Sequence, residues 1–214
     1  MRLLVTAFDP FGGEPVNPAL EAVRRLPAEI AGAEVVTLQV PTVFGRSIDV
    51  VTAAIDELRP DAVICVGQAG GHPDVTPERV AINVDDARIP DNEGNQPLDR
   101  SVADDGPAAY FATLPVKAMV QAIRDEGLPS SLSNTAGTFV CNHLMYGVLH
   151  HLAVGGRSEV RAGFVHVPFI PEQVAGRPEL ASLPLAGITR ALECAVEAVV
   201  QHEEDIQLVA GTTH

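Results

Sequence analysis

The chain of 214 residues carries 14 lysine and arginine residues against 28 aspartate and glutamate residues, so its formal charge is −14 at pH 7. This length corresponds to one domain. With 46% hydrophobic and only 20% charged residues the chain can bury a sizeable core, which excludes a disordered acidic protein. The acidic balance, without any run of lysine or arginine, argues against a nucleic-acid partner and against an anionic membrane surface.

The first residues and the cysteines indicate a cytoplasmic location. Residues 1–9, MRLLVTAFD, are too short and too soon acidic for a signal peptide, and no apolar run is long enough to span a bilayer. The cysteines, Cys65, Cys141 and Cys194, are odd in number and widely spaced, unlike a disulfide framework. We therefore expect reduced thiols in a cytoplasmic protein.

Apolar runs of strand length alternate with amphipathic helical patterns along the chain. The expected strands are Leu3–Phe8, Val35–Val40, Ala62–Gly67, Val80–Val84 and Ala162–Phe169. Apolar residues spaced three and four apart predict helices at about 20–26, 48–58, 116–123, 142–152 and 188–200. This alternation predicts a mostly parallel, twisted sheet with helices on both faces. The expected fold is a single-domain three-layer α/β/α sandwich over residues 1–214.

Two segments fall outside these patterns. Residues Asn92–Pro107 are polar and rich in glycine, proline and aspartate, which predicts a long loop of the kind that often forms a lid or a binding element. The residues from about Glu203 to His214 are expected to form a mobile tail.

Ligands of such sheets collect at the carboxyl ends of the strands. Four segments lie there: 8–13 (FDPFGG), 67–72 (GQAGGH), 85–92 (DDARIPDN) and 134–143 (NTAGTFVCNH). Neither glycine-rich turn has a nucleotide-binding pattern, so tight turns are the simpler interpretation of the glycines. HExxH, an EF-hand loop and GxSxG are all absent from the sequence, which predicts neither a metal site nor a serine hydrolase.

One cysteine has the position of a nucleophile. Cys65 lies within a predicted strand and Cys194 within a predicted helix, so both are expected in the core. Cys141 directly precedes the helix predicted at Asn142–Leu152, where the helix dipole favours a thiolate and free N–H groups can bind an oxyanion. A buried structural role remains the alternative for this thiol.

A nucleophilic thiol needs a histidine, and the spacing leaves three candidates. The other four lie at the far end of the Cys141 helix or near the tail: His150, His151, His202 and His214. His143 is within one turn of Cys141, where it could equally cap or pack, and His72 follows a Gly-Gly turn. His166 interrupts an apolar strand, so it is either hydrogen-bonded in the core or projects into a site at the end of that strand.

Four long segments, in the same order from the first strand to the last, resemble the bacterial pyroglutamyl peptidase I family, also called pyrrolidone-carboxylate peptidase. They are Thr6–Gly13 with Asn17-Pro18, Glu78–Asn92, Ser133–His143 and His166–Gln173. The resemblance implies a cysteine exopeptidase that releases N-terminal pyroglutamate from peptides without a metal or organic cofactor. It also implies a homo-oligomer, with a tetramer suggested by the family.

The resemblance assigns a catalytic triad that acts through a thioester acyl-enzyme. Cys141 is the nucleophile, His166 the general acid and base, and Glu78 the carboxylate that orients His166. From spacing alone, a solvated carboxylate at a strand start is the favoured interpretation of Glu78. Arg88 is placed beside the oxyanion together with the Cys141 N–H, and an ion pair with Asp85 or Asp86 is its alternative role.

A small neutral lactam suits an apolar pocket with a few amide-directed hydrogen bonds. The residues that match the pocket of the family are Phe8, Phe11, Gln68, Ile89, Phe139 and Val140, with Gln68 as the lactam contact. The chain departs from the family at Ala7, where glycine is more common, and at Phe169, where tyrosine is more common. Either change could shift rate or specificity.

Two other functions are compatible with the same scaffold. A non-catalytic binding protein would use Gln68 and the phenylalanines but not the thiol. A nucleoside-phosphorylase-like enzyme would need a phosphate site, and the absence of basic residues in the glycine-rich turns argues against it.

Overall fold

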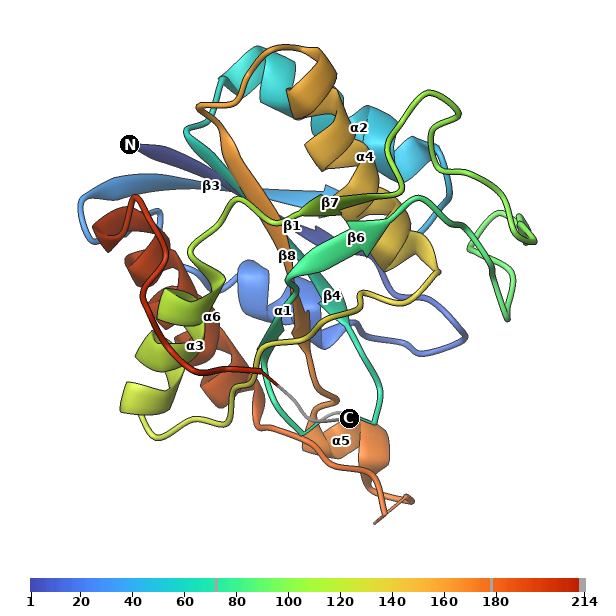
Figure 1. Cartoon of the computed structure of the whole chain (residues 1–214). Helices are drawn as coiled ribbons and strands as arrows, with labels where there is room; N and C mark the ends of the chain where they lie inside the picture. Colours follow the sequence, from blue (N-terminus) through green and yellow to red (C-terminus); the bar gives the residue numbers. More distant parts are fainter. Residues whose placement is uncertain (72, 178, 212–214) are drawn as a thin grey trace.

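A six-stranded sheet forms the centre of the computed structural model, which describes residues 1–71, 73–177 and 179–211 (Figure 1). Its strand order is β2-β3-β1-β4-β8-β5. The strands are β1 (Arg2–Phe8), β2 (Glu29–Ile30), β3 (Ala33–Val40), β4 (Ala62–Gln68), β5 (Thr76–Pro77) and β8 (Arg161–Val167). The four longer strands are parallel, and the short edge strands β2 and β5 are antiparallel to their neighbours.

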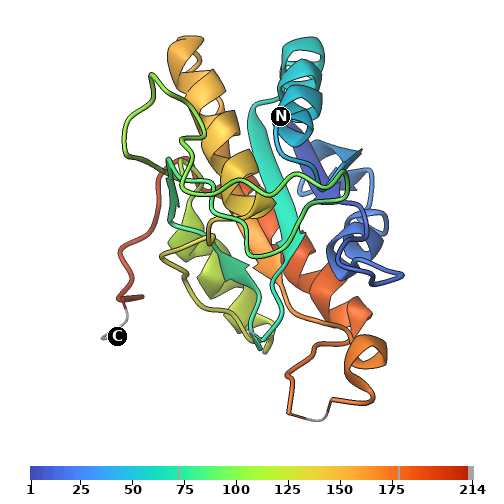
Figure 2. The same cartoon turned by 90° about the vertical axis from the view of Figure 1, so that its right-hand side faces the viewer.

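Helices cover both faces of this sheet, as the views in Figures 1 and 2 show. The helices are α1 (Pro18–Val23), α2 (Arg46–Leu58), α3 (Val116–Asp125), α4 (Val140–Val154), α5 (Pro171–Val174) and α6 (Leu185–Gln201). Helices α1, α3 and α6 share one hydrophobic core with the sheet, and α2 and α4 share the other. The predicted three-layer α/β/α sandwich is confirmed.

The alternation of side chains along β1 explains why its sequence after Arg2 is apolar except at Thr6. Leu3, Val5 and Ala7 point into the core beneath α1, α3 and α6. Leu4 and Phe8 point into the core beneath α2 and α4. Because a central parallel strand is buried on both faces, it has a continuous apolar run rather than an alternating one.

The expectation that Val80–Val84 is a strand of the central sheet is wrong. Strand β6 (Val80–Ile82) pairs with β7 (Ala109–Phe111) in a separate two-stranded antiparallel sheet, which packs on α4 (Figure 1). Only Ala81 of β6 is fully buried, and its two neighbours are half-buried. The valine and isoleucine that predicted a central strand therefore lie on a peripheral one.

The long loop has the predicted extent, since Asn92–Pro107 contains neither helix nor strand. Side-chain bonds fix it: Asn83 Oδ1 accepts the N–H groups of Val102 and Ala103 at 2.8 and 2.9 Å. Its action as a lid stays a prediction.

The segment after α6 is hydrogen-bonded to the start of α3. Both carboxylate oxygens of Asp205 accept hydrogen bonds from the N–H groups of Lys117 and Ala118 in the first turn of α3. Residues 212–214 of the predicted tail lie outside the described residues, and the mobility of the tail stays a prediction. No helix in the described part of the chain combines the length and the apolar character needed to cross a bilayer.

Helix α4 is fastened to β6 by one buried amide. Asn142 Oδ1 accepts the N–H of Ile82 at 2.9 Å, and Asn142 Nδ2 donates to the carbonyl groups of Ile82 at 2.9 Å and Val84 at 3.0 Å. Asn142 is fully buried. These bonds satisfy backbone groups that would otherwise face a helix without a partner.

Replacement Asn142→Ala should therefore destabilise the fold. Because three backbone groups lose their partner, we expect the free energy of unfolding to fall by about 3 kcal/mol. Urea denaturation measures this. The control is Asn134→Ala, which removes a single exposed bond to Arg79 and should change the free energy by less than about 0.5 kcal/mol. Equal effects of the two substitutions would contradict the role assigned to Asn142.

Candidate active site

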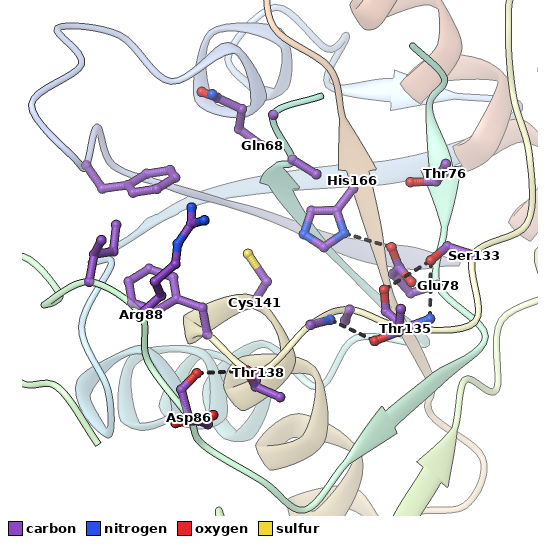
Figure 3. Close-up of a pocket in the computed structure, with 17 residues that line it drawn as sticks. Gln68, Thr76, Glu78, Asp86, Arg88, Ser133, Thr135, Thr138, Cys141 and His166 are labelled. Atoms are coloured by element: carbon purple, nitrogen blue, oxygen red, sulfur yellow. Dashed lines mark hydrogen bonds and ion pairs between the residues drawn. The ribbon is translucent and has the colours of Figure 1, made fainter. Parts of the chain in front are cut away.

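A cavity of about 440 Å³ lies at the carboxyl ends of β4 and β8, beside the first turn of α4 (Figure 3). Its wall combines segments that are far apart in the sequence. These segments supply Gln68 at the end of β4, Glu78 ahead of β6, Arg88, Phe139 ahead of α4, Cys141 and His166 at the end of β8. The carboxyl ends of the strands, where a ligand site is expected, therefore hold the main candidate residues.

Helix α4 presents Cys141 in its first turn. The helix begins at Val140, two residues earlier than predicted, and among the described residues no side chain caps it at Phe139. The N–H groups of a first helical turn have no acceptor within the helix, so they remain available beside the sulfur. The Cys141 side chain is partly exposed, whereas Cys65 and Cys194 are buried.

A glycine in β4 makes room for this sulfur. A Cβ atom on Gly67 would lie 3.1 Å from Cys141 Sγ and 2.8 Å from Phe164 Cζ. Side chains at such distances would have to shift, so the close approach of α4 to β4 depends on the glycine. Burial raises the pKa of the Cys65 thiol to about 12 and that of Cys194 to about 11, which keeps both in the neutral thiol form.

His166 is paired with Glu78 at the inner end of the cavity. The alternation along β8 places His166 on the same face as Phe164, toward α4. His166 Nδ1 lies 2.7 Å from Glu78 Oε1, and the two residues are 7% and 1% exposed. Figure 3 shows the His166 ring and the Cys141 sulfur facing the same space.

The environment of His166 favours its protonated form. Burial by itself lowers the pKa of His166, but the nearby Cys141, followed by the hydrogen bond and charge of Glu78, raises it from 6.5 to about 10. The second carboxylate oxygen, Glu78 Oε2, is buried without a hydrogen-bond partner among the described residues. Among the described residues, the His166 ring is therefore the one side-chain partner of the Glu78 carboxylate.

Three other histidines in the described part of the chain bond to partners other than the thiol. His143 Nδ1 lies 2.8 Å from Asp85 Oδ2, and His143 Nε2 accepts the N–H of Gly45 at 2.8 Å, so both ring nitrogens are occupied. His150 and His151 are held at the far end of α4 by hydrogen bonds to Tyr110 and Asp56 respectively. His72 and His214 lie outside the described residues.

Arg88 lines the cavity on the side of Cys141 opposite His166 (Figure 3). It forms no ion pair within the described part of the chain, and the carboxylate of Asp85, one alternative partner, binds His143 instead. The exposed guanidinium is thus free to bind an anion that develops near the sulfur.

Four of the six predicted pocket residues line the cavity: Phe11, Gln68, Ile89 and Phe139. The structure places Phe8 and Val140 in the core, 2% and 0% exposed. Phe8 follows the alternation of β1 and packs against Phe164 at a ring distance of 6.2 Å. Their side chains support the wall from behind and do not form it.

The two departures from the family pattern have different surroundings. Ala7 is buried in the core beneath α1, α3 and α6. The Phe169 ring packs so closely on Gly70 that an added Cβ there would lie 2.5 Å from it, and the Arg177 guanidinium stands 5.3 Å from the ring centre. The phenyl ring thus fills a packed position at the rim without needing a hydroxyl.

Sequence reasoning assigned no role to Gln173, which orients Gln68. Gln173 Oε1 accepts the N–H of Ile170 at 3.1 Å, and this fixes its amide so that Nε2 donates to Gln68 Oε1 at 3.3 Å. The amide nitrogen of Gln68 is the end left to donate elsewhere. The only signal was the position of Gln173 at the end of the segment that begins with His166.

Comparisons with known proteins point to one family. The family model described as Pyroglutamyl peptidase matches residues 1–202. The pyrrolidone-carboxylate peptidase of Streptococcus suis is 57% identical over 216 residues, and that of Finegoldia magna is 55% identical over 214 residues, each with 100% of both chains covered. The crystal structure of Bacillus amyloliquefaciens pyroglutamyl peptidase I matches with a TM-score of 0.92 at 51% identity, covering 96% of this chain and 99% of that one. The pyrrolidone carboxyl peptidase from Thermococcus litoralis matches with a TM-score of 0.92 at 35% identity, covering 97% and 98%.

The raised pKa of His166 predicts a pH-dependent stability. The folded protein binds this proton more tightly than the unfolded chain does. The stability that protonation of His166 contributes is therefore complete below pH 6.5 and is lost as the pH rises to about 10. The difference in unfolding free energy between wild type and His166→Gln should shrink over this interval, as urea denaturation can measure.

The matched variant for this pH dependence is Cys141→Ala. It removes the largest interaction that raises the pKa, so the stability contributed by His166 should be lost at lower pH than in the wild type. If the difference in unfolding free energy between wild type and His166→Gln stays constant between pH 6.5 and about pH 10, the raised pKa of His166 is contradicted.

Proposed function

Because the chain belongs to the pyroglutamyl peptidase family, whose members are cysteine-type omega-peptidases, we propose that it releases N-terminal pyroglutamate from peptides by attack of Cys141. One observation carries the assignment of the residues. The buried His166–Glu78 pair opens into the same cavity as a cysteine in the first turn of a helix. These are the parts that acyl transfer through a thiol requires.

The reaction begins with the thiolate of Cys141 paired with protonated His166. The sulfur attacks the carbonyl carbon of the pyroglutamyl residue, and the carbonyl oxygen becomes an oxyanion. N–H groups of the first turn of α4 and the guanidinium of Arg88 stabilise that charge. His166 then gives its proton to the leaving amine, the C–N bond breaks, and a thioester remains on Cys141.

Hydrolysis reverses these roles. A water molecule gives a proton to the now neutral His166 as its oxygen attacks the thioester carbon. The C–S bond breaks, free pyroglutamate leaves, and the thiolate of Cys141 again faces protonated His166. Glu78 does not exchange protons in this scheme, but it fixes the ring of His166 and stabilises its charge.

The wall of the cavity matches the lactam ring of the substrate. Phe11, Phe139 and Ile89 provide apolar surface for a small neutral ring. Gln68, oriented by Gln173, presents its amide nitrogen as a donor, which suits a lactam carbonyl group. The charged groups of the proposed reaction lie near the scissile bond rather than around the ring.

Release of a fluorogenic amine from a pyroglutamyl amide, in reducing buffer with a chelator, tests this function directly. We expect turnover by the wild type and a loss of more than about 10³-fold in Cys141→Ala, because no other group can form the thioester. Cys194→Ala, which changes a thiol buried in α6, should keep wild-type activity. A folded wild type that binds the lactam without turnover would establish a binding protein instead.

Replacement Arg88→Gln tests the oxyanion site. Because the guanidinium stabilises a charge that exists only during the reaction, kcat should fall about 10²-fold while KM changes less than about threefold. Steady-state kinetics with the same amide measures both constants. Arg24→Gln, at the exposed residue that follows α1, is the control. A change confined to KM would assign Arg88 to substrate binding.

A further inference from the structure

A second buried histidine–carboxylate pair lies behind the reacting end of α4. His143 and Asp85 are 6% and 5% exposed, and the bond between them spans 2.8 Å. Asp85 Oδ1 is buried without a partner among the described residues. His143 follows Cys141 by only two positions, yet the mechanism proposed above does not use it.

The bonds of His143 fix its protonation and exclude it from proton transfer. Its Nε2 accepts the N–H of Gly45 at 2.8 Å, so this nitrogen carries no proton. The proton therefore resides on Nδ1, which donates to Asp85. A neutral ring with both nitrogens engaged can hold neighbouring segments together but has no free site for a base.

The bond between His143 and Gly45 connects α4 to a row of packed aromatic rings, the last of which line the cavity. Phe44 stands edge-on to the His143 ring at 5.2 Å and edge-on to Phe139 at 5.4 Å. Phe139 in turn lies 6.3 Å from Phe11, and these last two rings line the cavity. Phe44 does not line it, so it acts on the pocket only through Phe139.

The segment that carries Phe44 is held by two side chains. The N–H of Phe44 donates to Asp91 Oδ2 at 2.9 Å, and the N–H of the next residue, Gly45, donates to His143. Gly45 has a positive φ of 73°, a conformation that glycine adopts without strain. Loss of the bond to His143 would leave the bond to Asp91 as the remaining side-chain bond to the N–H groups of Phe44 and Gly45.

We propose that His143 is a positioning residue for the substrate ring: its bond to the N–H of Gly45 holds Phe44 against Phe139 and so keeps the aromatic wall of the cavity in place. The inference rests on the proposed function, since the ring to be bound is the pyroglutamyl lactam. It assigns His143 to substrate binding and not to the chemical step.

The variant His143→Asn separates the two bonds. The asparagine amide can still donate to Asp85 in place of Nδ1, but it is too short to accept from Gly45. We expect KM for the pyroglutamyl amide to rise about tenfold and kcat to stay within about twofold, because a loosened wall weakens binding of the substrate and of the transition state alike.

A histidine on the same helix provides the matched control. His150 bonds to Tyr110 through Nδ1 at 3.0 Å and lies at the opposite end of α4 from the cavity. His150→Asn should lower the melting temperature without a change in KM. This comparison separates positioning from stability, since a merely structural role of His143 would give the same pattern in both variants.

A double-mutant cycle with Phe44 tests the route to the cavity. Phe44→Leu should raise KM by a similar factor, and the double variant should rise no further than the larger single effect, because both substitutions release the same wall. If His143→Asn fails to fold, Phe44→Leu decides: an unchanged KM overturns the proposal. Independent, multiplicative effects would also overturn it.

Different experimental results would contradict this inference and the proposed function. A wild type without turnover contradicts the function itself. A wild type that turns over, together with a folded His143→Asn of unchanged KM, contradicts only the role of His143. A fall in kcat with unchanged KM would place His143 in the chemical step and likewise overturn the proposal.

Discussion

The hydrogen bond between Glu78 and His166 is the interaction on which the rest of the site depends. A carboxylate that is 1% exposed, with one oxygen unpartnered among the described residues, is costly in a protein interior. A positive charge on His166 compensates it, and the raised pKa of His166 supplies that charge at neutral pH. The His166 ring in turn faces the Cys141 sulfur in the same cavity. Under the proposed function, the burial of Glu78 therefore prepares Cys141 for attack before any substrate binds.

Two buried histidine–carboxylate pairs lie near the first turn of α4, and their different second partners separate their roles. His143 Nε2 is occupied by a backbone N–H, whereas His166 faces the sulfur in a cavity large enough for a small ring. A paired carboxylate alone therefore does not mark a general base. The nitrogen opposite the carboxylate must also be open to the reacting atoms.

The sequence predicted the sandwich, and distinguished Cys141 from the other two cysteines, because both depend on local patterns. Buried parallel strands have continuous apolar runs, and the position of Cys141 at a helix start follows from the periodicity after it. Spacing could not choose among His72, His143 and His166, because that choice depends on contacts such as the one between residues 78 and 166. The resemblance to a family made the choice. It also placed Phe8 in the pocket, although the alternation of β1 turns this side chain into the core.

Cys141, Asn142 and His143 are adjacent in sequence, yet the first lines the cavity and the other two bind different parts of the fold. Asn142 binds β6, which begins just after Glu78, and His143 binds the segments that carry Arg88 and Phe44. Successive residues of a helix point in different directions, about 100° apart, so three neighbours can reach three segments. The first turn of α4 thus holds the proposed nucleophile and, through these bonds, the segments that carry Glu78, Arg88 and Phe44. A shift of this turn would disturb all four together, which is why buried polar bonds, and not apolar contacts alone, hold it.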